Sequence, residues 1–91
     1  MDEGEKHEKI RVRVTFPISK EGPYTAEVPP ETTVGTVLEA AMDHFKVQND
    51  AQFNYVLAHD GEELADSTTI GSLAGKSDEV RFTLVKKITQ G

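Results

Sequence analysis

Two segments near the ends of the chain alternate strictly between apolar and polar residues. The apolar positions are Ile10, Val12, Val14 and Phe16 in residues 9–16, and Val80, Phe82 and Leu84 in residues 80–85. Successive side chains of a β-strand point to opposite faces of the sheet, so both segments are predicted to be strands with one buried face. They are the most apolar of the predicted strands. We therefore expect them to lie side by side at the centre of a single sheet.

A further alternating run, residues 23–28, follows the first strand after a loop that contains Gly22. Two alternating runs joined by a short glycine-containing loop are typical of a β-hairpin. Pro29 and Pro30 end this second strand, because proline has no backbone N–H to donate to a neighbouring strand.

One amphipathic helix is predicted after the two prolines, from Val34 to Phe45 or Lys46. Its apolar residues recur at helical spacing and form one stripe, which consists of Val34, Val37, Leu38, Ala41, Met42 and Phe45. Thr32 or Thr33 precedes this stripe, and a threonine side-chain oxygen can cap the N-terminus of a helix.

The remaining elements are a strand at residues 53–59, a short returning strand at residues 62–64 and one helical turn around Ile70 and Leu73. Asp60-Gly61 between the two strands is typical of a type I′ hairpin turn. Strands arranged around a single helix indicate an α+β domain, with a mixed sheet of four to five strands packed on one helix.

Composition argues against several classes of function. The chain has 10 basic and 16 acidic residues and a net charge of -6, so neither nucleic acid nor an anionic membrane surface is an expected partner. It contains no cysteine, which removes thiol nucleophiles and thiolate ligands. No histidine or carboxylate spacing matches a metal site, and no base lies near the hydroxyl groups of residues 67–69. We expect no metal, no cofactor and no enzymatic activity. We expect a cytoplasmic monomer.

Three local motifs, in this order, resemble ubiquitin and its relatives of the β-grasp family. Thr33-Val34-x-x-Val37-x-x-x-Ala41 is similar to the start of the ubiquitin helix, and residues 57–66, LAHDGEELAD, are similar to its LIFAGKQLED turn. Residues 69–73, TIGSL, are similar to a TLSDY segment. The resemblance covers residues 9–91 and implies a ubiquitin-like β-grasp fold.

The resemblance also implies a role for the last residue, Gly91. Ubiquitin-like modifiers end in a flexible tail whose terminal glycine carboxylate is adenylated by an activating enzyme, and glycine lacks the Cβ that would obstruct a narrow channel. Gly91 is therefore the predicted conjugation residue, and an E1-like activating enzyme and target proteins are the predicted partners. Lys86, Lys87, Ile88 and Gln90 are the residues predicted to be recognised in the tail. Gln90 departs from the family, which mostly ends in two glycines.

The same resemblance is compatible with two other functions. The chain could be a sulfur carrier whose Gly91 becomes a thiocarboxylate, or a non-covalent interaction domain with an inert terminus. The open sheet face is where the family binds partners, and the predicted partner-binding surface consists of Arg11, Arg13, Val56 and Ala58. Val56 and Ala58 are placed there because Phe53, Tyr55 and Leu57 are the better set to face the helix. An ordinary half-polar sheet surface is the alternative.

The predicted organisation has three parts. Residues 1–8 are almost wholly polar and are expected to be a disordered leader. Residues 9–85 form the ubiquitin-like domain, and residues 86–91 form a flexible C-terminal tail.

Overall fold

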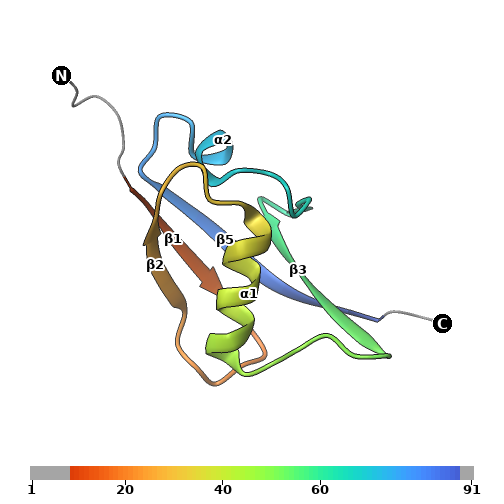
Figure 1. Cartoon of the computed structure of the whole chain (residues 1–91). Helices are drawn as coiled ribbons and strands as arrows, with labels where there is room; N and C mark the ends of the chain where they lie inside the picture. The colour runs from red at the N-terminus through yellow and green to blue at the C-terminus, as the bar shows by residue number, and fades with distance from the viewer. Residues whose placement is uncertain (1–8, 89–91) are drawn as a thin grey trace.

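The computed structural model describes residues 9–88, which form a mixed β-sheet with one long helix packed across one face (Figure 1). The elements along the chain are β1 (Ile10–Thr15), β2 (Tyr24–Val28), α1 (Val34–Phe45), β3 (Phe53–His59), β4 (Glu62–Glu63), α2 (Ile70–Ala74) and β5 (Glu79–Ile88). The predicted α+β class and the ubiquitin-like β-grasp arrangement are confirmed.

The sheet has five strands in the order β2-β1-β5-β3-β4. β1 and β5 run parallel and are direct neighbours, whereas β1 with β2, β3 with β5 and β3 with β4 pair antiparallel. The expectation that the first and last strands lie side by side is therefore confirmed, with β5 at the centre of the sheet (Figure 1). The register places Val12 opposite Val80 and Val14 opposite Phe82, so the apolar positions of both strands face the same side.

The core lies between this face of the sheet and α1. All six residues of the predicted helical stripe are buried, and so are the apolar residues of β1 and of the first part of β5. Ile70 of α2 is fully buried beside them. Among the described residues no polar or charged side chain is buried, so this core is held together by apolar burial alone.

Two local features predicted from the sequence are present in the structure, a helix cap and a hairpin turn. Thr33 is the N-cap of α1, and its side chain accepts a hydrogen bond from the backbone N–H of Thr36 at 3.3 Å. Asp60 and Gly61 both have positive φ, 54° and 83°, as a type I′ turn requires. The register of β3 against β4 closes this two-residue loop, because His59 pairs with Glu62.

The last strand is longer than the sequence predicts. The sequence predicts that the flexible tail begins at residue 86, but β5 includes Lys86, Lys87 and Ile88. These residues pair with Tyr55, Asn54 and Phe53 of β3. The boundary at Val85 is therefore wrong, because the polarity of these residues ends the apolar alternation without ending the backbone pairing. The predicted leader, residues 1–8, and the end of the predicted tail, residues 89–91, lie outside the described residues.

Candidate functional site

The face of the sheet opposite α1 is the main surface available for recognition. Alternation along each strand determines which side chains lie there. They are Arg11, Arg13 and Thr15 of β1, Thr25 and Glu27 of β2, Glu79, Arg81, Thr83, Val85 and Lys87 of β5, and Asn54, Val56 and Ala58 of β3. We call this set the outer face.

The four residues predicted to bind a partner do lie on the outer face, in two pairs separated by β5, and of these four only Arg13 and Ala58 line a common depression. Arg11 and Arg13 are on β1, Val56 and Ala58 are on β3, and β5 runs between these strands. The sequence reasoning missed Arg81, which occupies the intervening strand and pairs with Arg13. Alternation identifies Arg81 as the polar side of a strand, but only the strand order places it beside Arg13.

Ala58 is the least exposed of the four residues predicted to bind a partner. It points to the outer face but is only 8% exposed. It lines a depression whose other lining residues include Arg13, Arg81 and Thr83. Because so little of its methyl group is exposed, Ala58 offers little area to a partner, whereas Val56 is half-buried.

The charged residues of the outer face differ in whether they have a partner. Lys87 Nζ contacts Glu63 Oε1 at 2.9 Å, and Arg11 lies 3.8 Å from Glu27 with both side chains 60% exposed. Such exposed ion pairs contribute little to stability. The side chain of Arg13 has no ion pair or hydrogen bond to any other residue in the described part of the chain.

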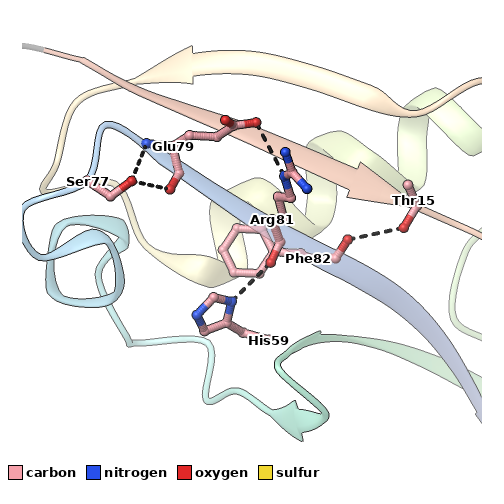
Figure 2. A network of polar contacts seen from close by, with 6 residues as sticks. All are labelled: Thr15, His59, Ser77, Glu79, Arg81 and Phe82. Carbon is pink, nitrogen blue, oxygen red and sulfur yellow. Dashed lines mark hydrogen bonds and ion pairs between the residues drawn. The ribbon is translucent and has the colours of Figure 1, made fainter.

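The backbone of β5 at the centre of the outer face is held from both sides, as Figure 2 shows. His59 Nδ1 donates a hydrogen bond to the carbonyl oxygen of Arg81 at 3.0 Å, and Thr15 Oγ1 donates to that of Phe82 at 3.4 Å. On the same strand, Arg81 Nε lies 3.7 Å from Glu79 Oε2. The strand that carries Arg81 is therefore anchored at Arg81 and Phe82 by side chains from β3 and β1.

The end of β5 beyond the core forms a two-stranded ribbon with the start of β3. Lys86 lies over the ring of Phe53, with Nζ 4.1 Å from the ring centroid, in a cation–π contact. Ile88 is 74% exposed, one of two large apolar side chains that are so open among residues 9–88. Three of the residues predicted to be recognised in the tail, Lys86, Lys87 and Ile88, therefore belong to this ribbon, and Gln90 and Gly91 lie outside the described residues.

Asp50 organises the loop that leads into the ribbon. Its Oδ1 accepts hydrogen bonds from the backbone N–H groups of Gln52 and Phe53, both at 2.8 Å. These bonds favour the ionised carboxylate and lower the pKa of Asp50 below its usual 3.8. The positive charge of Lys86 acts in the same direction, more weakly, while desolvation opposes both.

We expect the Asp50 carboxyl group to titrate below pH 3.8 in the folded protein. Because the folded state then binds this proton less readily than the unfolded chain, the carboxylate stabilises the fold above the unfolded pKa of about 3.9. That contribution is lost as the pH falls through the lower folded pKa. Carboxyl carbon NMR across the acid range measures the pKa directly. Lys86→Gln should raise the pKa of Asp50 slightly, and a wild-type pKa of 3.8 or above would contradict the prediction.

Among residues 9–88 no group of three or more histidine, aspartate or glutamate side chains is arranged to hold a metal ion. No helix in this part of the chain is long and apolar enough to cross a membrane.

The fold and sequence can be compared with known proteins. The model of a family described as BilA ubiquitin-like domain 2 matches residues 11–87. No curated protein matches the chain. A solved structure of ubiquitin from Caldiarchaeum subterraneum has a TM-score of 0.70 and 25% sequence identity, and the alignment covers 91% of this chain and 99% of that one.

Two further structures show likeness of fold alone. The structure of ATG8 from Trypanosoma brucei has a TM-score of 0.68 at 14% identity, with 92% of this chain and 78% of that one covered. A structure described by the words "Molecular Mimicry of SUMO promotes DNA repair" has a TM-score of 0.63 at 18% identity, and the alignment covers 88% of this chain and 94% of that one. The outer face and the ribbon are therefore features built on a widely shared scaffold.

Proposed function

Because the chain belongs to the BilA ubiquitin-like domain 2 family, we propose that it is a ubiquitin-like protein modifier that is activated at Gly91 and joined through it to target proteins. On this proposal the chain is the substrate of an ATP-dependent, E1-like activating enzyme. A lysine amine on a target protein is the acceptor.

The observation that supports the proposal is the ribbon at the end of β5. Ile88 is the last described residue, three positions before Gly91, and it ends β5, where it pairs with Phe53 at the start of β3. Its side chain is largely exposed, and its strand pairs with β3 past the last buried position of β5, Leu84. A protein that binds at Ile88 would therefore not disturb the core.

The proposed chemistry uses the carboxylate of Gly91 in three transfers. A carboxylate oxygen attacks the α-phosphorus of ATP, so that an acyl-adenylate forms and pyrophosphate leaves. A cysteine thiolate of the enzyme attacks the acyl carbon and displaces AMP. The amine of the target then attacks the thioester, which releases the thiol and leaves an amide bond. No side chain of this protein acts as an acid or base in these steps.

Deletion of Gly91 provides the test, and we expect it to abolish conjugation completely. The chain carrying an N-terminal tag, and the same chain without Gly91, are expressed in the native host and purified under denaturing conditions. Mass spectrometry then searches for peptides joined to lysine through Gly91. The deletion lies outside residues 9–88, so matching circular dichroism spectra should show that both proteins fold equally well.

The possible results separate the three functions. Adducts through Gly91 that are missing from the deletion variant would support the modifier. Replacement of a carboxylate oxygen of Gly91 by sulfur would instead indicate a sulfur carrier. A free carboxylate under every growth condition would overturn both and leave a non-covalent interaction domain.

A further inference from the structure

Two arginine side chains lie next to each other at the centre of the outer face. Arg13 of β1 and Arg81 of β5 are register partners on parallel strands, and both are exposed. Like charges at directly opposed positions of a sheet repel each other and destabilise the pairing. A protein with a net charge of -6 nevertheless has two arginines at directly paired positions of its sheet here.

The positive charge of this pair is only partly compensated within the described chain. Arg81 has one ion pair, to Glu79 at 3.7 Å, and its side chain remains 77% exposed. The side chain of Arg13 has no ion pair or hydrogen bond among residues 9–88, and the register neighbour of Arg13 on β2 is the uncharged Thr25. No residue of the described part of the chain therefore occupies the N–H donors of the Arg13 guanidinium group.

The surroundings of the pair suit a carboxylate. Thr15 and Thr83 are register partners two positions further along the same strands, and with Arg13 and Arg81 they line the depression. Asp60 also lines it, but the side chain of Asp60 is 89% exposed and its carboxylate lies 3.7 Å from His59 Nε2. Guanidinium groups bind carboxylates through two parallel hydrogen bonds, which gives both attraction and orientation.

The same surroundings argue against nucleic acid. Glu27, Glu79 and Asp60 lie close to the arginines, so the face has no continuous basic path for a phosphate backbone. An apolar element is also present. Val56 and Val85 are register partners on the outer face, about 13 Å along β5 from Arg81 at a rise of about 3.3 Å per residue.

We propose that Arg13 and Arg81 bind aspartate or glutamate side chains of an acidic segment of a partner protein, whose apolar residue rests on Val56 and Val85. The partner's carboxylates neutralise the repulsion between the two arginines, so the complex gains an interaction that the free protein lacks. This recognition requires no covalent chemistry and stands whether or not Gly91 is conjugated.

The test uses random dodecapeptides displayed on phage, selected on the full chain. We expect the selected peptides to be enriched in aspartate and glutamate next to an apolar residue. One selected peptide is then synthesised and titrated into isotope-labelled protein. The largest amide shift changes should map to β1 and β5 around Arg13 and Arg81, and added salt should weaken binding.

Matched variants separate a specific site from general charge attraction. Arg13→Gln and Arg81→Gln should each weaken peptide binding about tenfold, because each removes charge-assisted hydrogen bonds. The double variant Lys20→Gln/Lys46→Gln removes two positive charges in the β1–β2 loop and after α1, and it should bind the peptide as wild-type does. The unperturbed amide spectrum of each variant confirms folding.

Three results would overturn the proposal. The first is a selection that yields no binding peptide or peptides without acidic residues. The second is equal binding by the arginine variants and wild-type. The third is binding of a fluorescein-labelled oligothymidine that depends on Arg13 and Arg81, which would assign the pair to nucleic acid.

Discussion

Phe82→Ala is expected to destabilise the domain by about 3–5 kcal/mol, the range for truncation of a buried phenylalanine. Phe82 lies on the central strand β5, is 2% exposed and faces α1. Truncation removes apolar area from water and leaves a cavity that strands paired on both sides cannot close. Since small domains are stable by about 5–15 kcal/mol, the variant should lose a large part of its free energy of unfolding.

Phe53→Ala is the matched control for this measurement. Phe53 is also a phenylalanine of the sheet, but it is half-buried on the ribbon, where its ring contacts Lys86. Its truncation should cost about 1 kcal/mol. Urea titrations followed by far-UV circular dichroism give both free energies of unfolding. Equal losses of unfolding free energy in the two variants would contradict the prediction that burial of Phe82 makes it the more important of the two rings.

Gly71→Ala is expected to destabilise the domain by about 1–3 kcal/mol. This is the reverse of the usual effect in a helix, where alanine is more stable than glycine. Gly71 is in α2, and its backbone N–H donates to the carbonyl oxygen of Pro30 at 2.8 Å. A Cβ at this position would lie 2.9 Å from Pro30 Cβ and 3.0 Å from Pro30 O. The hydrogen bond and the rigid proline ring leave little freedom to move, so either the bond lengthens or α2 shifts away from the core.

Gly22→Ala gives the opposite expectation and serves as the control. A Cβ at Gly22 would meet no atom within 4 Å. Alanine there should leave the stability unchanged or raise it by up to about 1 kcal/mol, because the unfolded chain loses conformational freedom. Thermal unfolding midpoints distinguish the two cases. A Gly71→Ala variant as stable as wild-type would show that α2 is free to move away from Pro30.

These two predictions differ in what information they need. Burial of Phe82 follows from the alternation of residues 80–85, which any reader of the sequence can see. The crowding at Gly71 has no local signal, since it arises where α2 meets the segment before α1. Gly71 and Pro30 are distant in sequence, and their approach depends on how the whole chain folds.

In the candidate site too, some features follow from local sequence patterns and others depend on how distant segments meet. Hydrophobic alternation, the helical stripe and the Asp60-Gly61 turn are local patterns, and they determined the strands, the helix and the residues of each face. They also carried the likeness to ubiquitin that led to Gly91.

The apolar alternation of the first and last strands already predicted that β1 and β5 are neighbours, but only the tertiary structure placed β3 on the other side of β5 and set the register of each pair. The register brings Arg13 beside Arg81, and pairing with β3 places Ala58 in the same depression and extends β5 to Ile88. The physical reason is that alternation along a strand specifies which way each side chain points but not which strand lies next to it. Strand order and register come from contacts between distant parts of the chain, and a sheet surface is made of residues from several strands at once.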